Sequence, residues 1–210
     1  MTSDPLHQGM IDHEQGLRAI YAAPTERARR KCLPALDRHC WNFIARSPFL
    51  CLGTATADGA DVSPRGDAPG FVQVLDDGRL LIPDRPGNNR LDSLGNLVAN
   101  PQVGLLFMIP GVDETLRVNG IASITSNERL LARCAVAGKV PKSGILVEVR
   151  EAYLHCGKAL IRARLWHDDY KIERRRLPTL GQMITDQVPG GASAAEADAR
   201  IEHAYKHNLY

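Results

Sequence analysis

Short apolar, β-prone segments separated by turn-forming residues fill the centre of the sequence, and this spacing limits the possible folds more than any other feature. The segments are FLCLGTAT, GFVQVL, RLLIPD, VGLLFMIP and TLRVNGIASIT, all between residues 49 and 125. ADGAD and DDG supply turn-forming residues between them. Because strands this short and this closely spaced pair with near neighbours, the pattern predicts a small antiparallel barrel.

Helical patterns interrupt and flank this centre. IDHEQGLRAIYAA and ALDRHCWNFIARS precede it, and each ends just before a proline. NRLDSLGNLVAN predicts a helical insert that ends before Pro101, and SNERLLARCAVAG predicts another helix with Ser126 as its N-cap. GILVEVREAYLHC predicts one more long strand, and SAAEADARIEHAYKH predicts a last helix.

These patterns predict a mainly β fold with α additions, arranged as a split antiparallel barrel with flanking helices. We expect a single domain over residues 1–210, with a helical lead at 11–47, the barrel at 48–157 and a helical tail at 158–210. A chain of this length can form one complete core. The glycine pair at 190–191 indicates a hinge before the last helix.

Composition excludes several classes of protein. The 26 basic and 24 acidic side chains nearly balance, so no general electrostatic case for nucleic-acid binding exists. The five cysteines are scattered without a C-x-x-C pair, which argues against a disulfide framework and a zinc site, and we expect no metal. The sequence shows no export signal and no run of eighteen apolar residues, so we expect a cytoplasmic protein that spans no membrane.

Two polar stretches indicate an anion-binding site. SPRGDAPGF, at 63–71, contains two prolines and two glycines, so it predicts a shaped loop or a strand edge that presents Arg65. IPDRPGNNR, at 82–90, carries polar side chains where a strand turns into a helix. A helix N-terminus offers unpaired N–H groups, and arginine forms charge-assisted bonds to phosphate. The side chains that favour a phosphate site here are Arg85, Asn88, Asn89 and Arg90.

An alternative is open for the arginines of the second stretch. Arg85 and Arg90 could be surface charges that pair with Asp84 and Asp92. Three arginines and two asparagines beside rigid turns strengthen the case for a binding site, so that the two interpretations stand level.

The sequence from about Trp41 to about Thr125 resembles the flavin split-barrel proteins related to pyridoxamine 5'-phosphate oxidase. The resemblance is carried, in order, by SPFLCLGTATADG, DVSPRGDAPGF, LLIPDRPGNNR, NPQVGLLFMIPG and TLRVNGIASI. It is strongest toward the branch with the Ser-Pro-Arg-Gly-Asp loop. The resemblance implies a homodimer that binds FMN at the subunit interface, with the flavin ring against strand backbone and the phosphate on basic residues.

The resemblance also implies individual contacts. The loop around Arg65 falls where the family places a flavin- or phosphate-contacting segment. The strand end before Arg85 would lie along the ring, and the following turn departs from the oxidase's Ser-Arg-Lys set. Thr115 would stand where a glutamine meets the flavin, and Arg117 would point to the site or to a salt bridge. The implied cofactor-binding residues are Ser63, Arg65, Gly66, Asp67, Pro83, Asp84, Arg85, Asn88, Asn89, Arg90, Thr115 and Arg117.

Four residues at or beyond the end of the barrel have both a functional and a structural interpretation. His155 and Cys156 could supply an acid or a thiolate near the ring, although a histidine at a strand end is more often structural. Lys158 could meet a phosphate or stay solvated, and Trp166 could cover a flavin or pack a core. No catalytic residue is assigned, and no serine-histidine-acid order or HExxH motif supports a hydrolase.

Two functions therefore stand side by side. The first is an FMN-dependent oxidoreductase, in which the cofactor carries the redox chemistry and the protein binds and tunes it. The second is a non-catalytic flavin-binding module for storage or electron relay, and a weaker third is a barrel for another phosphorylated or haem-like ligand. The oxidase's C-terminal contact pattern is not recognisable, so the sequence names neither a substrate nor an electron donor.

Overall fold

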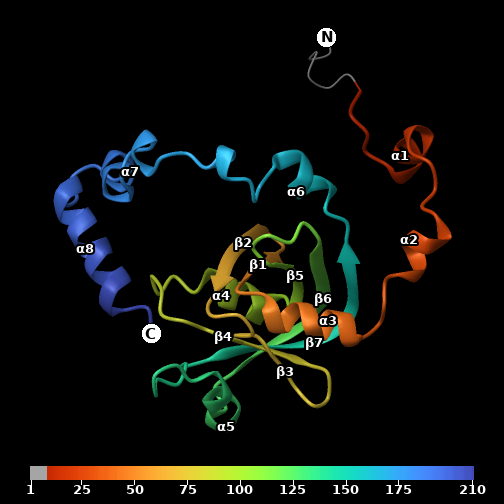
Figure 1. Ribbon diagram of the computed structural model, residues 1–210, viewed down its shortest axis with the longest axis horizontal. Helices are drawn as coiled ribbons and strands as arrows, with labels where there is room; N and C mark the ends of the chain where they lie inside the picture. The colour runs from red at the N-terminus through yellow and green to blue at the C-terminus, as the bar shows by residue number, and fades with distance from the viewer. Residues whose placement is uncertain (1–8) are drawn as a thin grey trace. The chain divides into compact units, whose positions relative to one another are not determined.

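The computed structural model describes residues 9–210, which form two compact units that divide between Cys32 and Leu33 (Figure 1). Two short helices lie in the first unit, α1 (Glu14–Ile20) and α2 (Glu26–Arg30), and neither buries a residue. The first expected helix is thus shorter than its pattern predicted, and α2 lies where no element was expected. The prediction of a single domain over 1–210 stays a prediction.

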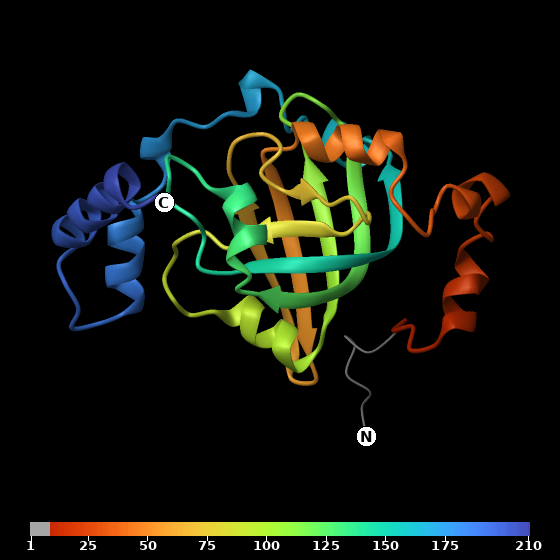
Figure 2. The ribbon, with the colours of Figure 1, turned by 90° about the horizontal axis from the view of Figure 1, so that it is seen from below.

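The second unit is built on one antiparallel sheet of seven strands, ordered β2-β1-β5-β6-β7-β4-β3. Figure 2 shows β6 and β7 curving strongly, so that β4 crosses β1 and β2 at a steep angle. The sheet does not close, because β2 and β3 are its two edges. The predicted fold class, a mainly β split barrel with flanking helices, is confirmed. The strands are β1 (Phe49–Thr56), β2 (Gly59–Gly66), β3 (Gln73–Val74), β4 (Leu80–Pro83), β5 (Gln102–Met108), β6 (Thr115–Thr125) and β7 (Gly144–His155).

The core lies on the concave side of the curved sheet and follows from the strand periodicity. Successive side chains of a strand point to opposite faces, so Leu50 and Leu52 of β1 are buried while their neighbours are partly exposed. β5 repeats this alternation with Val103, Leu105 and Phe107. Apolar burial of this kind is the main stabilising contribution to such a sheet.

A bulge in the β6–β7 pair accompanies the strong curvature. Asn119 pairs with Glu151 and Gly120 pairs with Val149, so Arg150 is an extra residue on β7. A bulge bends its strand and increases the local twist. A Cβ on Gly120 would lie only 2.3 Å from the Glu148 carbonyl oxygen, so glycine is the residue that this close approach accommodates.

Helices flank the sheet and extend beyond it. α3 presents Cys40 and Ile44 to the core, and the Asp37 carboxylate caps it by accepting from the His39 and Cys40 N–H groups. In Figure 2, α3 lies at one end of the curved sheet and α4 at the other. The helices of this unit are α3 (Arg38–Arg46), α4 (Asp92–Ala99), α5 (Glu128–Leu131), α6 (Lys158–Ala163), α7 (Leu180–Gln187) and α8 (Ala194–His207), with 3-10 turns at Ala132–Cys134, Asp168–Tyr170 and Arg174–Arg176.

Three elements differ from the sequence predictions. The helix expected from Asn89 begins at Asp92, because Asn89 and Leu91 adopt left-handed backbone with φ of 58° and 59°. Helix α5 is capped by Asn127 rather than Ser126, and it passes into a 3-10 turn after one turn. Only two residues of GFVQVL form a strand.

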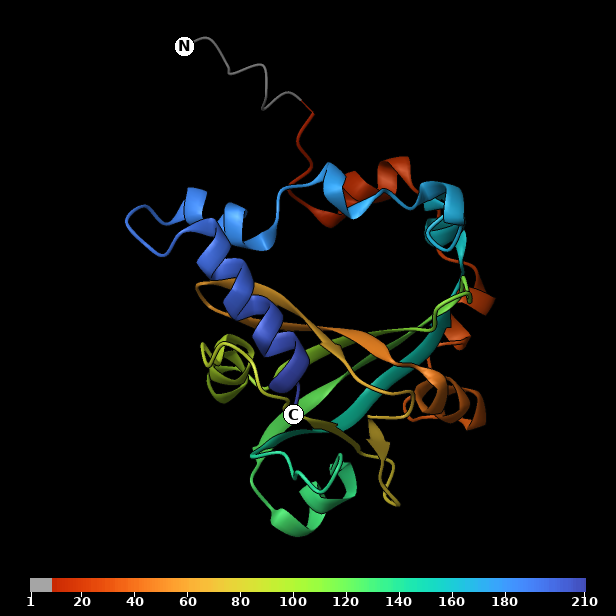
Figure 3. The same cartoon turned by 60° about the vertical axis from the view of Figure 1, so that its left-hand side comes forward.

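The tail ends in the helix pair α7 and α8, which pack against each other. Ser193 and Glu196 form a reciprocal capping box at the start of α8, as the pattern of the last helix favours. Figure 3 shows α8 leading to the end of the chain beside the sheet. Within residues 9–210, no helix combines the length and apolar character that a membrane crossing requires.

Candidate functional site

A cavity of about 870 Å³ lies where the edge strand β2, the segment after β4 and the start of α4 meet. The loop before β7 and the side chain of Tyr210 complete its wall. Most of the residues predicted to bind a cofactor converge here from separate parts of the sequence. Those that line the cavity are Ser63, Arg65, Gly66, Pro83, Asp84, Arg85, Asn88, Asn89 and Arg90.

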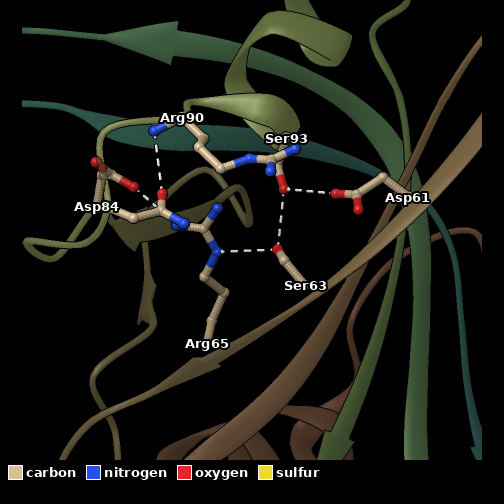
Figure 4. Close-up of polar contacts among 7 residues, drawn as sticks. Asp61, Ser63, Arg65, Asp84, Arg90 and Ser93 are labelled. Atoms are coloured by element: carbon tan, nitrogen blue, oxygen red, sulfur yellow. Dashed lines mark hydrogen bonds and ion pairs between the residues drawn. The ribbon is translucent and has the colours of Figure 1, made fainter. Parts of the chain in front are cut away.

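Arg65 is one link of a polar chain that joins three elements (Figure 4). Its Nη1 donates to Oδ1 of Asp84 at 2.7 Å, and its Nε donates to Oγ of Ser63 at 3.3 Å. The two side chains of the ion pair are 19% and 22% exposed, so the pair faces the cavity without being fully solvated. Arg65 comes from β2, where side chains alternate in exposure and the odd-numbered ones are partly buried.

The same chain continues through Ser93 on α4. Ser63 Oγ lies 2.9 Å from Ser93 Oγ, which in turn lies 3.1 Å from Oδ2 of Asp61. Because Arg65 can only donate and Asp61 can only accept, the protons of both hydroxyls point toward Asp61. With the protons arranged in this way, the Ser63 oxygen accepts from the Arg65 guanidinium. The two serines therefore orient Arg65, and neither hydroxyl is an activated nucleophile. Ser93 is only 3% exposed, and Figure 4 shows it between Ser63 and Asp61.

Arg85 forms a second, separate ion pair at the cavity wall. Its Nε donates to Oδ2 of Asp67 at 2.7 Å, and the Asp67 side chain is only 2% exposed. Burial raises the pKa of Asp67, but hydrogen bonds from Tyr210, Ala68 and Arg85, together with the Arg85 charge, outweigh it and lower that pKa below 3.8. Asp67 does not line the cavity itself; it supports Arg85 from behind.

The turn between β4 and α4 has an unusual backbone. Asn88 Oδ1 accepts from the Arg90 N–H at 3.0 Å, a local bond typical of asparagine in turns. Arg90 pairs with Asp92 at 2.8 Å, and both side chains are more than half exposed. The alternative interpretation as a surface pair thus describes Arg90 in this structure, whereas Asp84 pairs with Arg65 and Arg85 pairs with Asp67.

Two of the implied cofactor residues lie outside the cavity wall, at the start of β6. Thr115 is buried and pairs in register with His155 of β7. Arg117 is exposed, and its guanidinium carbon lies 5.3 Å from the ring centre of Tyr153. Arg117 thus points neither into the cavity nor into a salt bridge among residues 9–210; it packs on an aromatic ring.

The remaining candidates after the barrel also lie off the cavity wall. Cys156 is exposed, and Lys158 begins α6. The Trp166 indole N–H donates to the Val112 carbonyl at 3.0 Å, a partner that the structural interpretation of a tryptophan predicts. Residues 9–210 contain no group of three or more His, Cys, Asp or Glu side chains that could hold a metal ion.

Several residues of the cavity wall were not predicted from the sequence. Lys139 and Lys142 come from the loop before β7, and Tyr210 comes from the end of the tail. No local pattern marks these three, because only the tertiary fold brings them to β2 and β4. Ser93 carried a signal, since a serine in the first turn of a helix after a polar turn is a usual place for a polar contact. The basic and acidic side chains of the wall are Arg65, Arg85, Arg90, Lys139, Lys142, Asp61, Asp84 and Asp92.

These charges favour an anionic ligand. Within residues 9–210, five basic side chains against three acidic ones leave the wall with a positive excess. The first residues of α4 also belong to the wall, where a helix N-terminus adds partial positive charge. A shaped, polar cavity with charged donors on its wall can bind and orient a phosphorylated small molecule.

Comparison with known proteins identifies the family. The family model for pyridoxamine 5'-phosphate oxidase matches residues 36–156, which is more than half of the chain. The chain belongs to the pyridoxamine 5'-phosphate oxidase family. The match covers all seven strands of the sheet but not α1, α2 or the tail from α6 onward, and it contains every implied cofactor residue. No curated protein matches the sequence.

Several solved structures resemble part of this chain at low identity. HupZ of Group A Streptococcus is 16% identical, with 57% of this chain and 93% of that chain covered and a TM-score of 0.45. A NimC/NimA family protein from Clostridium acetobutylicum is 17% identical, with coverages of 58% and 88% and a TM-score of 0.43. The FAD binding protein from Mycobacterium smegmatis is 16% identical, with coverages of 59% and 97% and a TM-score of 0.41. The family assignment rests on the family model and not on these likenesses.

Proposed function

We propose that this member of the pyridoxamine 5'-phosphate oxidase family binds FMN and acts as an FMN-dependent oxidoreductase. The observation that carries the proposal is the convergence of Arg65, Arg85 and Arg90 on one cavity, in a chain whose family typically binds FMN. The cavity, at about 870 Å³, lies within the range of small-molecule and cofactor sites. Its residues fit a phosphorylated flavin, because they combine charged donors with the apolar Phe71 and Leu94.

Arg65 and Arg85 are the residues that would hold the phosphate. Asp84 accepts from Nη1 of Arg65 and Asp67 accepts from Nε of Arg85, while each guanidinium carries five N–H donors. The donors that remain can bind phosphate oxygens while the carboxylate on the other side fixes the guanidinium. Ser63 supports Arg65 in the same way, through its bond to Nε.

The redox chemistry would come from the cofactor, since a bound flavin supplies hydride or electron transfer. The protein's part is to bind and orient the ring and to exclude water from it. Among the residues that the structure describes, the wall includes no histidine or cysteine, and this proposal assigns no acid or base to the chain. A non-catalytic flavin-binding module for storage or electron relay would have the same wall, and turnover with a nicotinamide donor separates the two.

We also propose a homodimer with the flavin at the subunit interface. The family typically forms such dimers, and the open sheet leaves the edge strand β2 unpaired on its outer side. Val62 of that strand is 68% exposed, which suits a surface that a second subunit covers. Light scattering should report about twice the chain mass of 23.0 kDa, and a monomer that binds FMN tightly would contradict the dimer.

The test of FMN binding is a titration followed by flavin fluorescence, with riboflavin as the ligand that has the same ring and no phosphate. Arg65→Ala and Arg85→Ala should each weaken FMN about ten- to a hundredfold, the effect of losing a charge-assisted hydrogen bond. Riboflavin binding should change far less. Arg79→Ala is the matched control, because Arg79 also pairs with an aspartate, Asp77, but lies outside the cavity wall.

Two results would refute the proposal. If the wild-type protein binds FMN no better than riboflavin, the cavity is not a phosphate site. If both variants bind FMN as the wild type does, Arg65 and Arg85 only form ion pairs with aspartates, as Arg79 does, and do not bind the phosphate.

A further inference from the structure

Tyr210 reaches the cavity from the far end of the sequence. Its phenol Oη donates to Oδ1 of Asp67 at 2.7 Å, across 143 residues of chain. Its ring centre lies 5.2 Å from the guanidinium carbon of Arg85. Its main-chain oxygen accepts from Nζ of Lys139 at 2.9 Å. Three separate contacts, one to each of three elements, therefore hold this residue at the wall.

Asp67 connects Tyr210 to Arg85. Its Oδ1 accepts from the Tyr210 phenol and from the Ala68 N–H, and its Oδ2 accepts from Arg85. A carboxylate that is 2% exposed needs such partners, because an unpaired buried charge is very costly. The same hydrogen bond from the phenol to Asp67 raises the pKa of Tyr210, which keeps the phenol protonated and donating.

These contacts leave part of the Arg85 guanidinium available to a ligand. Among residues 9–210, Arg85 donates only its Nε to a protein acceptor. Asp67 therefore holds one edge of the guanidinium, the Tyr210 ring lies against the same group, and both terminal nitrogens remain for a ligand. A guanidinium fixed in this way loses less side-chain entropy when it binds, so the preorganisation increases affinity.

We propose that Tyr210 is a positioning residue for the phosphate of the bound ligand and acts through Arg85. This inference rests on the proposed function, because it assigns the phosphate to the terminal nitrogens of Arg85. The Tyr210 ring restrains the Arg85 guanidinium, and the Tyr210 phenol holds Asp67 in place behind that guanidinium. Lys139 anchors the main chain of Tyr210. Selectivity for the phosphorylated flavin over riboflavin thus depends on a residue 125 positions beyond Arg85.

The experiment compares FMN and riboflavin affinities in Tyr210→Ala and Tyr210→Phe. Tyr210→Ala should weaken FMN about fivefold, as expected for loss of a cation–π contact, and should leave riboflavin unchanged. Tyr210→Phe keeps the ring over Arg85 and should recover most of the loss. Tyr170→Ala is the matched control, because Tyr170 lies 4.9 Å from the Arg164 guanidinium, outside the cavity wall. It should change neither affinity.

A double variant tests whether Tyr210 acts through Arg85. In an Arg85→Ala background, Tyr210→Ala should weaken FMN no further, because the group that it restrains is gone. An additive loss would overturn the inference, as would equal weakening of FMN and riboflavin, which would make Tyr210 a wall for the ring. If Tyr210→Ala does not fold, Tyr210→Leu keeps apolar bulk without a π face and gives the same answer.

Different results would refute the proposed function and the role of Tyr210. A wild-type protein that does not select FMN over riboflavin refutes the proposed function and this inference together. A wild-type protein that selects FMN, with a Tyr210→Ala variant that selects it equally well, refutes this inference alone.

Discussion

Arg65 and Asp84 form an ion pair of 2.7 Å across the opening of the sheet. Arg65 lies on the edge strand β2 and Asp84 follows β4, and four other strands separate β2 from β4 in the sheet order. The pair of Arg85 with Asp67 crosses the same opening in the opposite sense, with the arginine after β4 and the carboxylate after β2. The candidate phosphate donors are therefore also the side chains that link the two ends of the open sheet.

The first prediction concerns the competition between Asp84 and a bound phosphate. Asp84→Asn removes a negative charge beside Arg65 but keeps the Oδ1 acceptor that orients the guanidinium. We expect FMN to bind about three- to tenfold more tightly, because a like charge near the phosphate is lost in a partly desolvated site. Titration with FMN and riboflavin checks this, and riboflavin binding should not change.

Asp77→Asn serves as the control, since Asp77 pairs with Arg79 outside the cavity wall. Weaker FMN binding in Asp84→Asn would mean that the carboxylate is needed to position Arg65 and does not compete with the ligand.

The second prediction concerns acid stability and Asp67. Its pKa is lower in the folded chain than its usual 3.8, so the ionised form stabilises the fold. That contribution is fully present above the unfolded value and is lost as the pH falls through the folded value. Asp67→Asn should therefore be less stable than wild type at pH 7, by about 1–3 kcal/mol, because Arg85 and Tyr210 lose a charged partner.

The difference in unfolding free energy between wild type and Asp67→Asn should shrink as the pH falls below about 4. Urea unfolding at pH 7, 5 and 3 measures it. Asp76→Asn is the control, because Asp76 is exposed and forms no hydrogen bond or ion pair with the described residues. A difference that stays constant with pH would mean that the Asp67 charge does not contribute.

Local sequence patterns were sufficient to predict most of the elements of the sheet unit. Strand periodicity predicted β1, β5, β6 and β7, because each has apolar residues on one face and flanking turn residues. Apolar spacing and a terminal proline predicted α3. These are signals within ten or fifteen residues, and the packing of the sheet agrees with them.

The candidate site was predictable only in part. Grouping of arginines beside rigid turns correctly brought Arg65, Arg85 and Arg90 to one cavity. Their partners depend on contacts across the sheet opening, so adjacency in sequence suggested Asp84 for Arg85, whereas Asp67 is the observed partner. Tyr210 lies at the wall only because the tail returns to the sheet, and no local pattern encodes such a return.

Backbone conformation explains another difference. The pattern NRLDSLGNLVAN suggested a helix from Asn89, yet the helix begins only after Leu91. Leu91 has a left-handed backbone, which is a genuine exception for a bulky residue, and propensity alone does not predict it. Such residues concentrate at functional sites, and this one belongs to the cavity wall.

The last prediction concerns the bulge that accompanies the curvature of the sheet. In Gly120→Ala, the new Cβ would lie 2.3 Å from the Glu148 carbonyl oxygen and 2.9 Å from Val147 Cγ1. Both neighbours belong to β7, which pairs with β6 here, so relief of the clash requires movement of the strand backbone. We expect a loss of about 2–3 kcal/mol in unfolding free energy, measured by urea unfolding.

Gly104→Ala is the matched control on the adjacent strand β5, because its Cβ would meet only the Asn119 Oδ1 at 3.5 Å. Gly104→Ala should be neutral or slightly stabilising, since alanine loses less backbone entropy on folding. Equal effects of the two variants would show that strand glycine as such, and not the close approach at the bulge, determines the stability.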